Sequence, residues 1–205
     1  MRRILFISTL LLFICVSSFG MAFNNHRSGF IIGGLGGFCV DNWSMVDEDG
    51  VKIDSGTANG LHFDFRIGVG FKGDKLMLYC WGLVNYFGGG SYSPAFNMMY
   101  GIGVSYYFKP IAPSFYVNAG FGIQQYSYHT RPNWIWFGYH TEEYLGPGIM
   151  GGIGYEFARH WSMEFGVMWS YPRYQYDDDD IFDEYKADKA INSLAITLSI
   201  IRIAY

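Results

Sequence analysis

Two glutamates, Glu156 and Glu164, interrupt the sequence GIGYEFARHWSMEFGVMW at residues 152–169, which otherwise holds mostly glycine, aromatic and aliphatic residues. Two carboxylates that face one another can act as general acid and general base, one giving a proton and the other taking it. The alternative is an architectural role, in which each buried carboxylate lies beside a cation that offsets its charge. The choice between the two depends on the elements that carry these residues.

A two-residue period runs through the segments around the glutamates. In LHFDFRIGVGF, residues 61–71, every odd position is Leu, Phe, Ile or Val, and the even positions are His, Asp, Arg and Gly. Side chains alternate between the two faces of a strand, so this pattern predicts a strand with one wholly apolar face. The same alternation predicts strands in MMYGIGVSYYF, FYVNAGFGIQ and WSMEFGVMWSY, at residues 98–108, 115–124 and 161–171. Less regular strand-like segments lie at residues 29–40, 76–87, 144–157 and 191–205.

These eight segments have the length that a membrane-spanning strand needs. A tilted strand crosses a bilayer in about 9–11 residues, whereas strands of soluble domains hold about five or six. The connections alternate between short turns (72–75, 109–114, 158–160) and longer polar or glycine-rich loops (41–59, 88–96, 130–142, 172–190). The sequence therefore predicts an all-β chain, an eight-stranded antiparallel up-and-down transmembrane β-barrel with periplasmic turns and extracellular loops. A soluble lipocalin-like barrel is the alternative, and it would turn its apolar face inward.

The N-terminus predicts export across a membrane. Arg2 and Arg3 precede a largely apolar stretch, and the small residues Gly20 and Ala22 offer cleavage sites. This layout is typical of a secretory signal peptide, here residues 1–22, followed by a barrel domain at residues 23–205. Cleavage leaves 12 Lys and Arg against 18 Asp and Glu, a net charge of −6. The chain has no basic patch, so nucleic acid is not an expected partner.

Aromatic residues cluster where the predicted strands meet their turns and loops. Rings that are part apolar and part hydrogen-bonding suit the two membrane–water interfaces. The expected members of the aromatic girdles are Phe71, Phe108, Phe115, Phe157, Trp161, Trp169, Tyr171 and Tyr205.

The signal peptide, the hairpin GIGYEFARHWSMEFGV and the C-terminal ITLSIIRIAY resemble the OmpA/OmpX-like outer-membrane β-barrel families. The resemblance implies a monomer in the outer membrane of a Gram-negative bacterium, in contact with outer-membrane lipid and lipopolysaccharide. Such families commonly end in an aromatic residue that the barrel-assembly machinery recognises, and the matching residues here are Ile201, Ile203 and Tyr205. With these three side chains on the lipid face, Arg202 would face the lumen, whereas Thr197 and Ser199 would face lipid.

The charged residues of the strands are expected inside the barrel. A charge on the lipid face costs about 2–4 kcal/mol near the midplane, and an eight-stranded barrel is just wide enough for side chains to fill it. The predicted lumenal ion-pair network consists of Asp64, Arg66, Glu156, Glu164 and Arg202. This interpretation makes the two glutamates part of a plug, because a filled barrel leaves no room for a substrate.

Catalysis remains an alternative on grounds of family resemblance. Small eight-stranded barrels include lipid A acylases and deacylases, which use His with Ser and an acidic residue near the outer surface. The candidates in this chain are Ser127, His129, His140 and either Glu142 or Glu143. The surrounding sequence YSYH matches no family signature, so we expect no catalytic residues.

The leading expectation is a structural or surface-interaction role, without cofactor or metal. The four long loops (41–59, 88–96, 130–142 and 172–190) would meet a host or surface ligand. The acidic run DDDDIFDE at residues 177–184 lacks the spacing and the glycine of a calcium loop. A narrow pore for ions or small solutes is the second hypothesis, and a lipid A-modifying enzyme is the third.

Overall fold

The computed structural model describes residues 26–47, 49–71, 73–87, 93–133, 138–174 and 189–205. The predicted signal peptide and the acidic run at residues 177–184 lie outside the described residues. Among the described residues, no helix is long and apolar enough to span a bilayer.

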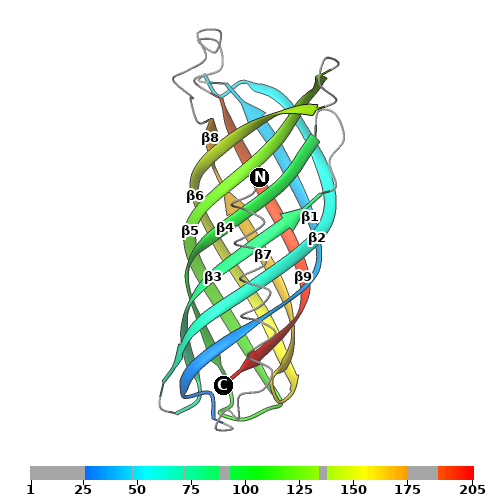
Figure 1. Cartoon of the computed structure of the whole chain (residues 1–205). Coiled ribbons are helices and arrows are strands. Elements are labelled where there is room, and N and C mark those ends of the chain that lie inside the picture. Colours follow the sequence, from blue (N-terminus) through cyan, green and yellow to red (C-terminus); the bar gives the residue numbers. More distant parts are fainter. Residues whose placement is uncertain (1–25, 48, 72, 88–92, 134–137, 175–188) are drawn as a thin grey trace.

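The described chain is an antiparallel barrel in which each long strand pairs with the next one along the sequence (Figure 1). Pairing of the first strand with the last closes the barrel, from Ile32 opposite Ala204 to Val46 opposite Ala190. The strands are β1 (Gly29–Val46), β2 (Lys52–Gly70), β3 (Leu76–Tyr86), β4 (Ser93–Tyr107), β5 (Ser114–Asn133), β6 (Gly138–Ala158), β7 (Trp161–Ser170), β8 (Arg173–Tyr174) and β9 (Ala190–Ala204). Because β8 is a two-residue strand that follows β7 and pairs with β6 and β9, the barrel wall has eight long strands. The predicted eight-stranded up-and-down barrel is confirmed.

The strands differ in length, and this gives the barrel two unlike ends. At the turn end, the connections are residues 71–75, 108–113 and 159–160. At the opposite hairpin end, β2 continues along β1 beyond the end of β3, and β5 and β6 continue together beyond the ends of β4 and β7.

The prediction of a loop at residues 41–59 is wrong, because the structure leaves only residues 47–51 outside strands there. The predicted loop at residues 130–142 is likewise mostly strand, with β5 reaching Asn133 and β6 starting at Gly138. Past the apolar belt of the barrel, polar residues that include Asn42, Ser55 and Thr57 take most outward positions of the β1–β2 ladder. The contrast between faces that reveals a strand in the sequence is lost there, although the backbone ladder continues.

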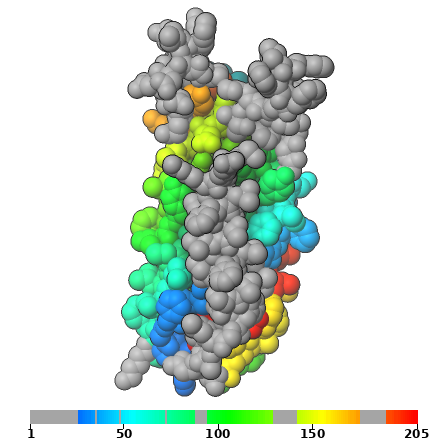
Figure 2. Space-filling model, viewed as in Figure 1, coloured from blue at the N-terminus to red at the C-terminus, as the bar shows by residue number. Residues whose placement is uncertain are grey.

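The outer face of the barrel is apolar and the inner face is packed. In β7 the side chains alternate without a break between exposed and buried, starting with exposed Trp161. Each of the eight long strands contributes at least two large exposed apolar side chains to the outer face. In space-filling view the body is longer than it is wide, and the visible side chains of the described strands pack closely side by side (Figure 2). This is the inside-out arrangement expected of a membrane barrel and the opposite of a lipocalin-like one.

Aromatic and methionine side chains fill much of the lumen. Buried Trp81, Met99, Tyr116 and Met150 belong to one cluster, which extends from the turn end into the middle of the barrel. Tyr116 reaches inward beneath Gly154, where a Cβ atom would lie 2.1 Å from the ring carbon that bears its hydroxyl. Only glycine leaves space for the ring at that position.

The final strand corrects the sequence prediction for its orientation. Ile201, Ile203 and Tyr205 are buried in the lumen, and Arg202 lies on the outer face beside Trp161, its partner in register on β7. The inward positions of the same strand therefore include Thr197 and Ser199, and its outward positions carry four apolar side chains: Leu194, Ile196, Leu198 and Ile200. This orientation keeps the hydroxyls inside and the outer face apolar. The prediction that Ile201, Ile203 and Tyr205 face lipid is therefore wrong.

Candidate functional site in the barrel lumen

A first group of charged side chains, the central cluster, consists of Asp64, Arg66 and Glu164. Arg66 Nη2 donates to Asp64 Oδ2 and to Glu164 Oε1, both at 2.6 Å, and Arg66 Nε lies 3.1 Å from each Asp64 oxygen. The second oxygen of Glu164 accepts from the Tyr116 hydroxyl at 2.8 Å. All three charged residues are buried. One guanidinium thus offsets two carboxylates, and a phenol completes the hydrogen bonding of Glu164.

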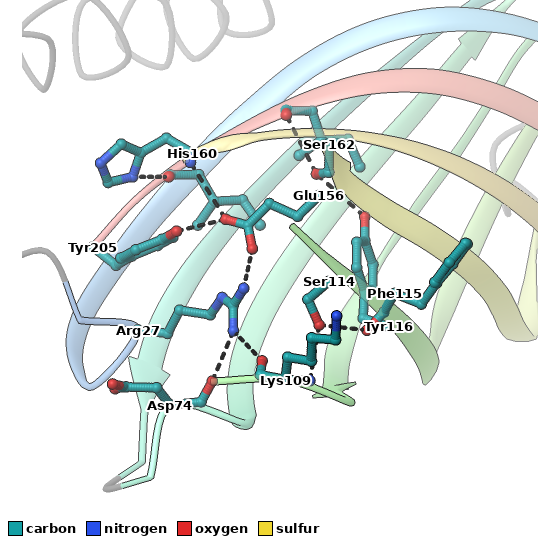
Figure 3. Close-up of polar contacts among 12 residues, drawn as sticks. Arg27, Asp74, Lys109, Ser114, Phe115, Tyr116, Glu156, His160, Ser162 and Tyr205 are labelled. Atoms are coloured by element: carbon teal, nitrogen blue, oxygen red, sulfur yellow. Dashed lines mark hydrogen bonds and ion pairs between the residues drawn. The ribbon is translucent and has the colours of Figure 1, made fainter. Parts of the chain in front are cut away.

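A second group, the mouth cluster, lies at the turn end and consists of Arg27, Glu156 and Tyr205 (Figure 3). Arg27, only 1% exposed, forms an ion pair with Glu156 and stacks over the Tyr107 ring at 4.0 Å. The other oxygen of Glu156 accepts from the Tyr205 hydroxyl at 2.5 Å. The N-terminal segment, β6 and the end of β9 therefore meet at one carboxylate.

Arg27 also ties the turns of this end together. Its Nη1 donates to the backbone carbonyl of Asp74 at 3.0 Å and to that of Lys109 at 2.7 Å (Figure 3). Each carbonyl belongs to a different short connection, residues 71–75 and 108–113. A planar guanidinium with five donors can serve several acceptors at once, which a lysine could not do with the same geometry.

The structure assigns the inner partners of the two glutamates differently from the sequence. Asp64, Arg66, Glu156 and Glu164 all face the lumen, but Glu156 and Glu164 belong to separate clusters, each with its own arginine. The predicted lumenal position of Arg202 is wrong, because it lies outside against the Trp161 ring at 5.4 Å. Arg27, and not Arg202, is the cation that pairs with Glu156 inside the barrel.

Sequence reasoning missed Arg27 because it precedes the first predicted strand and falls in no alternating pattern. One signal was available in the sequence. Three acidic residues were predicted inside the barrel with Arg66 and Arg202, and placing Arg202 outside leaves too few inward cations. A search for the missing cation would have led to the segment just before β1, since the first residues before the barrel lie at the turn end.

The arrangement at the two clusters favours a structural over a catalytic role. Glu156 and Glu164 are each held by an arginine and a tyrosine, and both oxygens of Asp64 are held by Arg66, so none of the three carboxylates is turned toward open space. A cavity of ≈ 10 Å³ borders Asp64 and Glu164 and is lined on its other sides by residues that include Met150 and Met168. That volume holds about one water molecule, which is far less than a substrate needs.

The hairpin end of the lumen is also polar. Asp41 is fully buried and accepts from Ser193 at 2.7 Å and from Asn97 at 3.5 Å. Nearer the rim, Tyr128 donates to Asp54 at 2.9 Å, which links β5 to β2 across the inside of the barrel. The lumen therefore holds polar side chains along its length, and the large core cluster packs among them from the turn end into the middle of the barrel.

The turn between β6 and β7 carries a histidine in an electropositive setting. Burial lowers the pKa of His160, and the positive charges of Arg159 and Arg202 lower it further, against the raising effects of the Ile203 carbonyl and the Glu156 carboxylate. His160 Nδ1 lies 2.9 Å from that carbonyl oxygen, and its ring packs against Tyr205 with 4.4 Å between centroids. His160 therefore locks the last residues of β9 onto the turn.

The predicted girdle residues divide into two groups. Six expose their rings on the outer face: Phe71, Phe108, Phe115, Phe157, Trp161 and Trp169. Tyr171 is half-buried. The assignment of Tyr205 to the girdle is wrong, because its ring points inward and its hydroxyl binds Glu156. The three residues proposed as an assembly signal, Ile201, Ile203 and Tyr205, all share this inward face.

The structure describes the side chains of three of the five candidates for catalysis: Ser127, Glu142 and Glu143. Ser127 and Glu142 are buried, and Glu143 is exposed and accepts from Gln125 at 3.1 Å. The side chains of His129 and His140 lie outside the described residues. Within the part of the chain that the structure describes, no group of three or more His, Cys, Asp or Glu side chains is arranged to hold a metal ion.

Comparison with known proteins identifies the fold. No family model and no curated protein matches the chain. Among solved structures, Neisserial surface protein A is 14% identical with a TM-score of 0.51, and the similarity covers 87% of this chain and 98% of that one. The outer membrane protein OprG from Pseudomonas aeruginosa is 12% identical with a TM-score of 0.47, over 90% of this chain and 100% of that one. The chain thus has the fold of a small outer-membrane β-barrel, as its resemblance to the OmpA/OmpX-like families implied.

Proposed function

We propose that this chain lies in the outer membrane of a Gram-negative bacterium as a plugged barrel with a structural or surface-interaction role. One observation carries the proposal: the barrel has an apolar outer face on all eight long strands and a lumen filled by side chains. A soluble protein rarely exposes an apolar patch of more than a few hundred Å². In a bilayer the same belt meets lipid tails, and the closed ladder leaves no unpaired strand edge within it.

The packed lumen supports a barrel that does not conduct. The central cluster and the mouth cluster join strands across the barrel through ion pairs and hydrogen bonds. The mouth cluster also holds two of the short turns through backbone carbonyls. An ion that crossed the lumen would have to displace these side chains, together with the buried aromatic and methionine side chains packed among them.

The hairpin end supports the surface-interaction part of the proposal. The ladder of β1 and β2 extends to Val46 and Lys52, and β2 residues 52–57 are exposed on both faces. Backbone pairing holds this hairpin in shape, so it offers a stiff recognition surface rather than a flexible loop. On this proposal the lipid and lipopolysaccharide of the outer membrane surround the barrel, the barrel-assembly machinery inserts it, and a host or surface ligand binds the hairpin end.

Two measurements on the refolded protein test the proposal. We expect the protein in detergent to migrate differently on a gel before and after boiling, as a barrel that resists SDS until heated. We then expect no discrete conductance steps in a planar bilayer. A soluble β-protein by circular dichroism in plain buffer would overturn the membrane placement. Steady ion conductance would replace the plug by the narrow-pore hypothesis. Altered lipid A in expressing cells, detected by mass spectrometry, would instead favour an enzyme.

A further inference from the structure

The outer face carries an arginine at a height where most of its neighbours are apolar. Arg202 lies on the same face of β9 as the exposed side chains of Leu198 and Ile200. Its guanidinium carbon is 5.4 Å from the centroid of the Trp161 ring, which is also on the outer face. A charge on a lipid-facing surface is costly near the midplane but costs only about 0–1 kcal/mol near the interface. Arg202 pairs with Trp161, the first residue of β7 after the short turn at residues 159–160, and thus lies at the interface on the turn side.

A second arginine and a histidine lie beside Arg202. Arg159 and His160 form the two-residue turn between β6 and β7, and Trp161 follows directly as the partner of Arg202 in register. The Ile203 amide donates to the His160 carbonyl at 2.9 Å, which fixes the turn against the end of β9. Both Arg159 and Arg202 are close enough to His160 to lower its pKa. We call Arg159, His160, Trp161 and Arg202 the rim site. Its two arginines make this corner of the barrel positively charged.

The two ends of the barrel differ in charge. At the turn end, the described side chains that reach outward or into the turns include four cations: Lys75, Lys109, Arg159 and Arg202. The acidic residues there, Asp74 and Glu156, face His26 and Arg27. At the hairpin end, the described residues outside the lumen carry both signs, with the acidic Asp47, Asp49 and Glu143 and the basic Lys52 and Arg173. A membrane-facing partner of the turn end should therefore be anionic.

We propose that the rim site binds the phosphate of a phospholipid in the periplasmic leaflet of the outer membrane. The inference rests on the proposed membrane placement. A guanidinium matches a phosphate group through paired, charge-assisted hydrogen bonds. The Trp161 indole suits the interface between head groups and acyl chains. Below it, the outward side chains of Met163, Leu198 and Ile200 continue as an apolar surface on which an acyl chain can lie.

The location of Arg202 selects a lipid over a free anion or a periplasmic protein. Its side chain leaves the barrel wall between apolar residues instead of projecting from the tip of a turn, so a ligand that contacts it also contacts the apolar face. A phospholipid satisfies both surfaces at once. Inorganic phosphate would use only the cations, and a molecule without phosphate would use only the apolar face.

Native mass spectrometry on the refolded full chain in dodecyl maltoside, which carries no phosphate, tests the proposal. The probes are dioleoylphosphatidylglycerol, dioleoylglycerol with the same acyl chains but no phosphate, and inorganic phosphate. We expect the phospholipid to bind and Arg202→Gln to weaken it about tenfold, the effect of losing one charge-assisted contact. Arg202→Lys should retain part of the affinity, because it keeps the charge and loses the paired geometry. Lys52→Gln, which removes a cation from the hairpin end, should change nothing.

The outcomes separate this inference from the membrane placement. Equal binding of the phospholipid to the parent and to Arg202→Gln would overturn the rim site, and so would equal retention of dioleoylglycerol. Displacement of the phospholipid by an equal concentration of inorganic phosphate would show a free-anion site instead. Each variant is also run boiled and unboiled on a gel. A heat-dependent shift with no phospholipid preference refutes the rim site alone, whereas loss of the shift in the parent refutes the membrane placement.

Discussion

Replacing Arg27 by glutamine should destabilise the barrel more than any exposed substitution at the same end. The change removes the only described cation beside Glu156 and leaves that carboxylate, which is buried, with the neutral donors Tyr205 and the His160 amide. Breaking a buried ion pair by removing one partner costs about 3–5 kcal/mol. The Asp74 carbonyl also loses its bond to the guanidinium. We therefore expect the free energy of unfolding to fall by about 3–5 kcal/mol.

The measurement is reversible urea unfolding of the protein in lipid vesicles, followed by tryptophan fluorescence. Lys109→Gln is the matched control, because it changes an exposed side chain and keeps the backbone carbonyl that Arg27 binds; we expect a change within about 0.5 kcal/mol. The double variant Arg27→Met with Glu156→Leu replaces both charges by apolar groups of similar size. It should cost less than the sum of its single changes by about 0.5–3 kcal/mol.

Two results would refute this reasoning. If Arg27→Gln stays within about 1 kcal/mol of the parent, Glu156 is solvated at the mouth and the ion pair contributes little, as at a protein surface. If the single changes add up in the double variant, the two side chains do not interact in the folded barrel. Either result would also remove the physical basis for a closed turn end.

Three further predictions follow from other parts of the barrel. Gly154→Ala should lower the free energy of unfolding by about 1–3 kcal/mol, because the new Cβ atom would meet the Tyr116 ring. Gly82→Ala is the control, since Gly82 has open space around it, and it should change the free energy of unfolding by less than about 0.5 kcal/mol. Urea unfolding of the two variants measures the difference. Burial lowers the pKa of His160, so the unfolded chain takes up a proton before the folded chain as the pH falls. The contribution of His160 to stability is therefore complete above about pH 6.5 and declines as the pH falls below that value. His160→Asn, in which asparagine tolerates the positive φ of 69°, should reduce the change in the urea midpoint between pH 7 and 5. A probe on exposed Cys80 should be quenched by lipids with brominated tails, whereas buried Cys39 should react with maleimide only after unfolding; unquenched Cys80 would contradict the membrane placement.

The fold could be read from the sequence because its cause is local. Where a strand separates an apolar environment from the lumen, every second side chain must be apolar, and the segments 61–71 and 161–171 show this without interruption. The same cause explains the missed extensions of β1 and β2. Beyond the apolar belt both faces of these strands tolerate polar residues, so the period vanishes from the sequence while backbone hydrogen bonds continue to Val46 and Lys52.

The site could be predicted only in part because its partners are set by register. The sequence placed Asp64, Arg66, Glu156 and Glu164 inward from the alternation of their own strands. Which arginine serves which glutamate depends on how β9 aligns with β7 and β1, and a shift by one residue exchanges the faces of a whole strand. The family resemblance predicts an outward-facing aromatic C-terminus and hence a lumenal Arg202, and with that cation counted inside, no pattern in the sequence points to Arg27.

The mouth cluster also bears on how the chain reaches its folded state. Arg27 precedes β1 and Tyr205 follows β9, yet both bind Glu156, so this carboxylate joins the two ends of the described chain. Contacts so distant in sequence cost chain entropy before they return any stabilisation. Until β1 pairs with β9, the sheet has two open edges, and the segment before β1 does not hold Arg27 beside Glu156. Closure of the barrel therefore pairs the edges and satisfies the buried charge in one step, which favours the closed ring over a partly formed, aggregation-prone sheet.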